Sequence, residues 1–427
     1  MKPSIHKTNL ENLDIARMSI RQIGKLVAQI ERESNVEFIH LEMGVPGLPA
    51  CEIGTAAEKR ALDSGVASLY PNIEGIAELK TETAQFAKLF LNIDVAAQNC
   101  IPTVGAMQGS FAALIAAART DAQRPYTLFI DPGFPVNKQQ LQIMGLPYRS
   151  IDLLNFRDEK LAEQLETMLA AGDICSITYS SPNNPSWLNL SEKELESIGK
   201  LADKYDVIVV EDLAYFAMDF RHNYGSVGVP PFQPTVAHYT DNYVLLLSAS
   251  KIFNYAGQRI GIMLIGNELS KKRFANLKNY FSDDAFFNFV VYGLLYATTS
   301  GTSHTAQYAL AAMLKAVNAG EYPFVEKLLP YADKAQKIKT IFRKYGFSLV
   351  YSDADGSLAD GFYFTVSYPG LTSGELLREF LYSGISAVSL SITGSTAEGL
   401  RICVSQVRDS QLAELDSRLQ LFLQRIK

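Results

Sequence analysis

The 427-residue chain has little of what marks several protein classes. Its 4 cysteines stand far apart without a Cys-x-x-Cys pair, and its 5 histidines show no ligand spacing, so neither a disulfide framework nor a metal site is expected. No stretch approaches the roughly 18 apolar residues of a membrane span. The net charge is −6, and no long basic run is present that would follow a nucleic-acid backbone. We therefore expect a soluble cytoplasmic protein without membrane or nucleic-acid partners.

What the sequence does contain is a series of short apolar runs. They lie at residues 126–130, 173–179, 207–210, 243–247 and 260–265, and each is bounded by polar or turn residues. Such runs are typical of buried strands. Between the second and third, Ser-Glu-Lys-Glu at 191–194 is a capping-box pattern that opens an amphipathic helix. The resulting βαβ unit predicts an α/β domain with a largely parallel sheet covered by helices.

The pattern changes after about residue 301. Helical periodicity covers residues 306–317, 322–345 and 373–382, and strand-like segments lie at 362–366 and 400–404. This arrangement predicts a separate, smaller α+β domain. The N-terminal helix and the extended segment that follows it are candidates for the same domain.

Polar residues follow three consecutive predicted strands. Ligands of open α/β sheets bind outside the carboxyl ends of the strands, so Asn184, Asp212 and Lys251 are expected at one rim. A lysine that leaves a buried strand is partly desolvated, and its neutral amine can form a Schiff base. Alone, Lys251 is more simply a solvated loop residue. Its neighbours favour the chemical interpretation, because Asp212 can pair with a pyridinium, Asn184 and Tyr215 can donate to a ring oxygen, and Ser248 and Arg259 can hold a phosphate.

A second phosphate-binding feature lies at Gly105-Ala106-Met107-Gln108-Gly109-Ser110. It precedes the apolar helical stretch 111–118, and free amides at a helix start bind anions. By itself this spacing more often marks a tight turn that packs a helix on a sheet. Because neither Gly-x-Gly-x-x-Gly nor a Walker loop occurs, a nucleotide-binding function has no support.

Residues 248–261 read Ser-Ala-Ser-Lys-Ile-Phe-Asn-Tyr-Ala-Gly-Gln-Arg-Ile-Gly. This segment resembles the lysine signature of class I/II aminotransferases, the fold-type I pyridoxal-phosphate enzymes of the aspartate aminotransferase superfamily. The resemblance extends from about residue 41 to 404. In the same order stand Tyr70-Pro71-Asn72-Ile73-Glu74-Gly75, Gly105-Ala106-Met107, Asp131-Pro132-Gly133-Phe134-Pro135, Ser181-Pro182-Asn183-Asn184-Pro185, Asp212 with Tyr215, Gly361-Phe362-Tyr363, and Arg401.

The resemblance implies a role for each matching residue. Lys251 would bind pyridoxal phosphate as a Schiff base and move the substrate proton, Asp212 would keep the pyridine nitrogen protonated, and Arg401 would bind the substrate α-carboxylate. The remaining contacts are implied as follows: Asn184 and Tyr215 to the ring oxygen, Phe134 stacked on the ring, Ser248, Arg259 and the backbone of Ala106 and Met107 to the phosphate, Tyr70 to the phosphate from the partner subunit, and Gly44 as backbone of the substrate pocket beside Asn184.

The implied fold has a large domain at residues 51–317 with a mostly parallel seven-stranded sheet. A smaller α+β domain would combine residues 1–50 with 318–427. The implied protein is a homodimer that exchanges an amino group between an L-amino acid and a 2-oxo acid by a ping-pong mechanism. These are the expectations that the resemblance brings.

Some positions depart from the family pattern. The usual Thr-Gly is Ser186-Trp187, the usual Glu after the aspartate is Leu213, and Met107 offers no hydroxyl. Trp187, the only tryptophan, is then either a packing residue or a wall of the substrate pocket, and packing is the simpler interpretation. Two other functions remain: a C–S β-lyase on the same scaffold, and a pyridoxal-phosphate-binding regulatory module.

Overall fold

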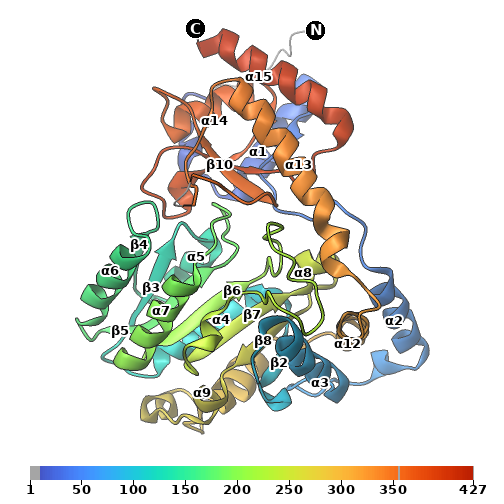
Figure 1. The fold of residues 1–427 in the computed structure, drawn as a ribbon, viewed down its shortest axis with the longest axis vertical. Helices are drawn as coiled ribbons and strands as arrows, with labels where there is room; N and C mark the ends of the chain where they lie inside the picture. Colours follow the sequence, from blue (N-terminus) through green and yellow to red (C-terminus); the bar gives the residue numbers. More distant parts are fainter. Residues whose placement is uncertain (1–9, 354–355, 427) are drawn as a thin grey trace.

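The computed structural model describes residues 10–353 and 356–426. Residues 1–9, which are the start of the expected small domain, residues 354–355 and residue 427 lie outside this description. Figure 1 shows a lower part built around a large sheet and an upper part in which segments from both ends of the chain meet. Helix α13 (Phe324–Lys344) runs from the lower part into the upper one.

The large sheet has seven strands in the order β2-β8-β7-β6-β5-β3-β4. Strand β8 pairs antiparallel with both β2 and β7, and the other neighbouring strands pair parallel. The predicted α/β fold with a mostly parallel seven-stranded sheet is thus confirmed. The strands are β2 (Cys100–Thr103), β3 (Tyr126–Asp131), β4 (Tyr148–Asp152), β5 (Ile174–Ser180), β6 (Ile208–Leu213), β7 (Tyr243–Ser248) and β8 (Gly261–Ile265).

Helices cover both faces of this sheet. On one face, α4 packs against Val210, Val244 and Leu246 of the central strands, and on the other face Val209, Leu245 and Leu247 pack under α7 and α12. These apolar residues alternate along β6 and β7, so each strand is buried on both sides. The helices are α2 (Glu52–Asp63), α3 (Ala77–Phe86), α4 (Gly105–Arg119), α5 (Pro135–Ile143), α6 (Glu159–Leu169), α7 (Glu192–Tyr205), α8 (Ala249–Ile252), α9 (Asn267–Lys271), α10 (Phe286–Asn288), α11 (Tyr296–Thr299) and α12 (His304–Asn318).

The upper part joins segments that are far apart in the sequence. Strand β1 (Ile39–His40) pairs parallel with β11 (Ile385–Ser386), and a four-stranded sheet has the order β12-β13-β10-β9. Phe38, Phe342, Phe364, Phe380 and Phe422 belong to its core. The other elements are α1 (Ile20–Ser34), β9 (Ser348–Leu349), β10 (Tyr363–Ser367), α14 (Ser373–Tyr382), β12 (Val388–Ser389), β13 (Leu400–Cys403) and α15 (Leu412–Ile426).

Most predicted elements are present, and the capping box at the start of α7 is formed in both directions between Ser191 and Glu194. Strands β2 and β4 were not predicted. Strand β2 has only four residues and contains Pro102, and β4 begins with half-buried Tyr148 and Arg149 and an exposed Ser150, so neither reads as an apolar run.

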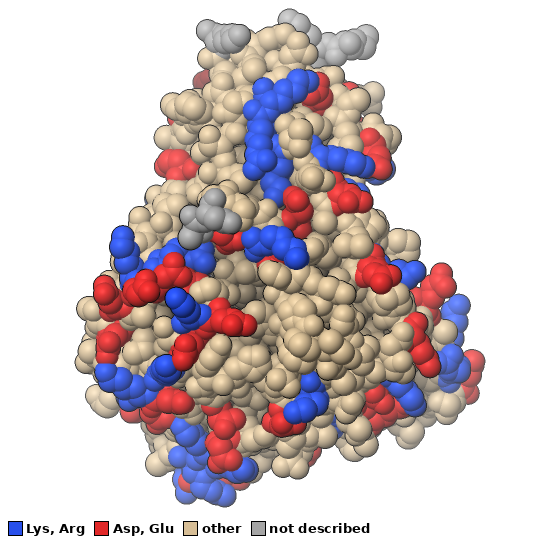
Figure 2. Space-filling view, in the orientation of Figure 1, with Lys and Arg blue, Asp and Glu red and all other residues tan. Residues whose placement is uncertain are grey.

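Acidic and basic side chains are intermixed over the lower part on the face shown in Figure 2. Within the described residues, no helix combines the length and the apolar character needed to cross a membrane. The same residues contain no cluster of three or more His, Cys, Asp or Glu arranged to hold a metal ion.

Candidate functional site

The carboxyl ends of β5, β6 and β7 bring three predicted side chains to one rim of the sheet. The strand register places Ser180 beside Asp212, and Asp212 beside Leu246. Asn184 follows β5 and Lys251 follows β7 within a few residues. The expected convergence of Asn184, Asp212 and Lys251 is therefore a direct consequence of parallel pairing.

Lys251 lies in the short helix α8, which Ser248 caps by accepting a hydrogen bond from the Ser250 amide at 3.2 Å. The Lys251 ammonium donates to the carbonyl oxygen of Gly44. Its nitrogen lies 5.3 Å from the ring centre of Phe362 and 5.8 Å from that of Tyr215. Burial among these groups lowers the pKa of Lys251 to about 8, so a substantial fraction of the amine is neutral and nucleophilic near physiological pH.

Asp212 is the second-last residue of β6 and lies on the same face of the strand as Val210, which packs against α4. One carboxylate oxygen accepts from the Ala214 amide at 2.9 Å, and burial raises the pKa of Asp212 to about 6. Asp212 shares a narrow cavity with Phe134 and Ser180. A positive charge in that cavity would stabilise the ionised carboxylate. Asp212 could therefore pair with a protonated ring nitrogen such as the pyridinium of pyridoxal phosphate.

An anion cradle lies at the start of α4, where Gly105 has a φ of +67°. A Cβ at this position would lie 2.4 Å from a guanidinium nitrogen of Arg259, so only glycine permits this approach. Arg259 donates to Ser250 Oγ at 3.3 Å and to the carbonyl of Ala256 at 3.1 Å. It forms no ion pair with an acid in the described part of the chain. The guanidinium and the first amides of α4, which include those of Ala106 and Met107, fit a phosphate group.

Arg401 lies in β13 with its guanidinium directed at Asn184, and it is only 1% exposed. Its Nη1 donates to Asn184 Oδ1 at 3.1 Å, and its Nη2 donates to the carbonyl of Glu42. Nε has no hydrogen-bond partner. No carboxylate of the described residues forms an ion pair with Arg401. A buried cation without a counter-charge is costly, so this geometry favours an anionic ligand such as a substrate carboxylate.

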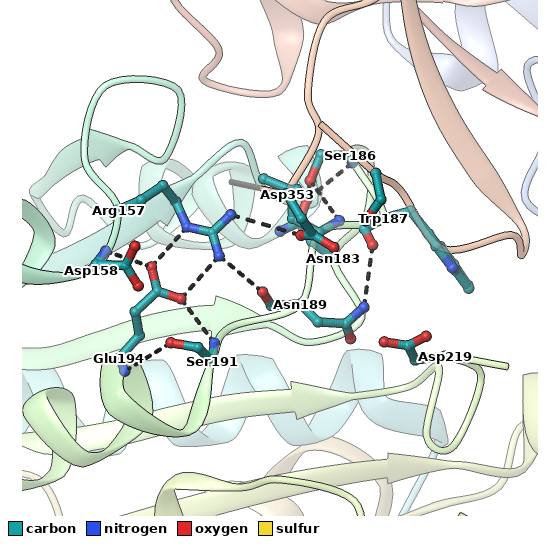
Figure 3. A network of polar contacts seen from close by, with 12 residues as sticks. Arg157, Asp158, Asn183, Ser186, Trp187, Asn189, Ser191, Glu194, Asp219 and Asp353 are labelled. Atoms are coloured by element: carbon teal, nitrogen blue, oxygen red, sulfur yellow. Dashed lines mark hydrogen bonds and ion pairs between the residues drawn. The ribbon is translucent and has the colours of Figure 1, made fainter. Parts of the chain in front are cut away.

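The turn after β5 holds Asn184 toward Arg401 through hydrogen bonds made by the neighbours of Asn184. Asn183 Nδ2 donates to the carbonyl of Pro132 at 2.8 Å. Asn183 Oδ1 accepts from Ser186 Oγ at 2.7 Å (Figure 3). The Ser180 hydroxyl accepts a hydrogen bond from the backbone N–H of Asn184 at 3.3 Å. The backbone on both sides of Asn184 is therefore fixed before any ligand binds.

Trp187 is fully buried and has a φ of +65°, a conformation that favours glycine. Its ring lies 5.2 Å from that of Tyr215 in an edge-to-face contact. Opposite it, a Cβ on Gly361 would lie 2.1 Å from the indole. Trp187 therefore packs into space that Gly361 leaves free, as expected for a packing residue. Its ring also contacts that of Tyr215.

The structure also brings in a residue to which the sequence analysis gave no role. The hydroxyl of Tyr363 lies 2.5 Å from that of Tyr215, and the Arg401 guanidinium carbon lies 4.7 Å from the centre of its ring. The only sequence feature that pointed to Tyr363 was its place in the family motif Gly361-Phe362-Tyr363. Of the predicted site residues, Tyr70 alone lies outside this arrangement, because it is 90% exposed on the surface of its own chain.

Comparisons with known proteins identify the family and the fold. A family model described as aminotransferase class I and II matches residues 37–419. The chain is 27% identical over 266 residues to the aspartate aminotransferase of Pyrococcus horikoshii and 25% identical over 270 residues to the LL-diaminopimelate aminotransferase of Oleidesulfovibrio alaskensis. These matches cover 60% and 62% of this chain and 62% and 66% of the relatives, which is less than two thirds of their length.

Solved structures of the same fold cover more of the chain. The alanine aminotransferase of Pyrococcus furiosus superimposes with a TM-score of 0.77 at 16% identity, over 98% of this chain and 99% of that one. The aspartate aminotransferase of Thermotoga maritima gives 0.76 at 19% identity, over 96% and 98%. The family match over nearly the whole sequence, the shared fold and the motifs that meet around Lys251 lead to one conclusion: the chain belongs to the class I and II aminotransferases.

Proposed function

We propose that this protein is a pyridoxal-phosphate-dependent aminotransferase that exchanges an amino group between an L-amino acid and a 2-oxo acid by a ping-pong mechanism. The observation that carries the proposal is that two cations lie close together, the partly buried Lys251 with a pKa of about 8 and the buried Arg401 without a counter-charge. An amine that reacts with carbonyls and a guanidinium that binds a carboxylate are the two groups that amino-acid chemistry on this cofactor requires.

Bound pyridoxal phosphate supplies a carbonyl for the amino group and an electron-withdrawing ring that makes the α-hydrogen of the substrate acidic. Asp212 holds positive charge at the ring nitrogen, Phe134 covers the ring face, and Asn184 and Tyr215 donate to the ring oxygen. Ser248, Arg259 and the amides of Ala106 and Met107 hold the phosphate.

The substrate side of the site follows from Arg401. Its guanidinium holds the α-carboxylate beside Asn184, with the backbone of Gly44 as the opposite wall. With the carboxylate held in this way, the α-hydrogen of the substrate points toward Lys251. The Lys251 amine would then take that proton from the substrate Cα as general base and, as general acid, deliver it to the cofactor carbon that carried the carbonyl.

Tyr70 would complete the phosphate site from a second subunit. Its 90% exposure on its own chain is what such a role requires. Mixing Tyr70→Phe subunits with Lys251→Ala subunits tests it, because a residue that acts across the interface leaves one intact site in each mixed dimer. A strictly monomeric active species would contradict the role.

The central experiment combines borohydride labelling with an amino-donor panel. Reduction should fix the cofactor on Lys251, and peptide mapping should find the label there. The panel, with 2-oxoglutarate and pyruvate as acceptors, should show amino transfer that depends on the acceptor. Release of pyruvate, ammonia and thiol from cysteine conjugates without an acceptor would instead establish a β-lyase. Cofactor binding without turnover would indicate a regulatory module.

A further inference from the structure

Tyr363 opens β10 directly opposite Cys403 of β13, and it is 1% exposed. Its hydroxyl lies 2.5 Å from the hydroxyl of Tyr215. It also closely approaches Gly44, where a Cβ would lie 1.8 Å from the Tyr363 oxygen. The hydroxyl is therefore enclosed between Tyr215 and the backbone segment whose carbonyl accepts from Lys251.

The ring of Tyr363 makes a second contact on the substrate side. The Arg401 guanidinium carbon lies 4.7 Å from the ring centre, in cation–π geometry. Because β10 and β13 are hydrogen-bonded neighbours, this stacking is built into the sheet. One residue thus touches both the group proposed to bind the substrate carboxylate and the group proposed to bind the ring oxygen.

The number of hydrogens decides the direction of the Tyr215–Tyr363 bond. Each phenolic hydroxyl has a single hydrogen to donate. When Tyr215 donates to the ring oxygen of the cofactor, it has none left for Tyr363, so Tyr363 is the donor between the two. A donated bond polarises the hydroxyl that receives it and strengthens that hydroxyl's own donation in a buried site.

We propose that Tyr363 is a positioning residue with two separable actions. Its hydroxyl donates to Tyr215 and aims that hydroxyl at the ring oxygen of bound pyridoxal phosphate, and its ring holds the Arg401 guanidinium flat for the substrate carboxylate. The inference rests on the proposed function.

The test separates hydroxyl from ring. Tyr363→Phe removes the hydroxyl alone, and Tyr363→Leu removes both the hydroxyl and the aromatic ring. Tyr243→Phe is the control, because Tyr243 is a buried tyrosine at the start of β7, whereas Lys251 follows the end of that strand. The first readout is the absorbance of the bound cofactor titrated against pH. The second is KM for the amino-acid donor that reacts fastest in the panel.

A hydrogen bond donated by Tyr215 stabilises the negative charge of the ring oxygen most strongly in the deprotonated form of the bound cofactor. Weakening this hydrogen bond therefore raises the midpoint pH of the absorbance change. Tyr363→Phe should raise the midpoint by roughly half a unit to one unit with KM within about twofold. Tyr363→Leu should raise the midpoint similarly and KM by at least about threefold. Tyr243→Phe should change neither.

A double-mutant cycle with Tyr215→Phe provides the decisive comparison. If Tyr363 acts through Tyr215, its hydroxyl has no effect on the midpoint in the Tyr215→Phe background, and Tyr215→Phe alone gives a shift at least as large as that of Tyr363→Phe. Additive shifts, a smaller shift from Tyr215→Phe, or a Tyr363→Phe midpoint equal to that of Tyr243→Phe would overturn the inference. Wild-type protein that binds no pyridoxal phosphate would overturn the proposed function instead.

Discussion

Two largely buried arginines of this molecule have opposite surroundings. Arg157, in the network of Figure 3, donates to the Glu194 carboxylate at 2.7 and 3.0 Å and to the carbonyl of Asn189 at 3.1 Å. Its Nη1 lies 4.0 Å from Asp353. Arg401, by contrast, donates only to an amide oxygen and a backbone carbonyl, and no carboxylate of the described residues pairs with it.

The difference separates a cation that serves the fold from one that serves a ligand. Burial alone would raise the pKa of Glu194, but the hydrogen bonds and charge of Arg157 hold it below its ordinary value, so each charge stabilises the other. Arg401 lacks such a partner, as does Lys251 beside it. A protein keeps buried charge uncompensated where a bound molecule completes it.

The largest effect is expected from Lys251→Ala, which removes the proposed base. Turnover should fall by about 10²–10⁴-fold or more, while the free energy of unfolding stays constant or rises because a desolvated amine is gone. Steady-state rates and urea unfolding measure the two quantities. Turnover near the wild-type value would place the base elsewhere.

Removal of the structural cation should have the reverse profile. Arg157→Ala leaves Glu194 buried without its partner, and we expect a loss of roughly 3–5 kcal/mol in the free energy of unfolding. Turnover per folded molecule should change little. The double variant Arg157→Ala/Glu194→Leu is the matched control and should regain part of the loss. A stable Arg157→Ala protein would mean that the network does not stabilise the fold.

Arg401→Ala should lower kcat/KM by at least about tenfold, because a bidentate charged pair contributes roughly 1.5–3 kcal/mol. Unfolding should be unchanged or shifted toward greater stability, in contrast to Arg157→Ala. Arg401→Lys should rescue only part of the activity, since an ammonium lacks the planar fork. The comparison between the arginines fails if Arg401→Ala unfolds easily and reacts normally.

The smallest effect is a pH dependence of cofactor uptake. The pKa of Lys251 in the free protein is lowered to about 8, so its amine is protonated below that pH and neutral above it. Uptake of pyridoxal phosphate by cofactor-free protein should therefore speed up with pH and level off above about pH 8. Rapid-mixing absorbance measures this rate. A rate that does not respond to pH through this range would contradict a titrating nucleophile.

Much of the cofactor side was predictable because it depends on neighbouring strands. Asn184, Asp212 and Lys251 follow apolar runs, and parallel pairing alone brings them together. The Tyr363–Tyr215 bond and the Arg401 bond to the Glu42 carbonyl join residues 148 and 359 positions apart. No local periodicity reports such contacts. Pairing of Arg157 with Glu194 was equally hidden, since it depends on how a loop folds over the start of α7.

The pairing of β1 with β11 affects the order in which parts of the molecule can fold during synthesis. Ribosomes release a chain from its N-terminus, and early segments fold first where their contacts are already available. The segment that carries Glu42 and Gly44 emerges long before its strand partner at residues 385–386. Lys251 and its strand can be in place while Gly44 still lacks its anchor. During biosynthesis the Lys251 amine therefore lacks its contact with an anchored Gly44 until residues 385–386 have emerged.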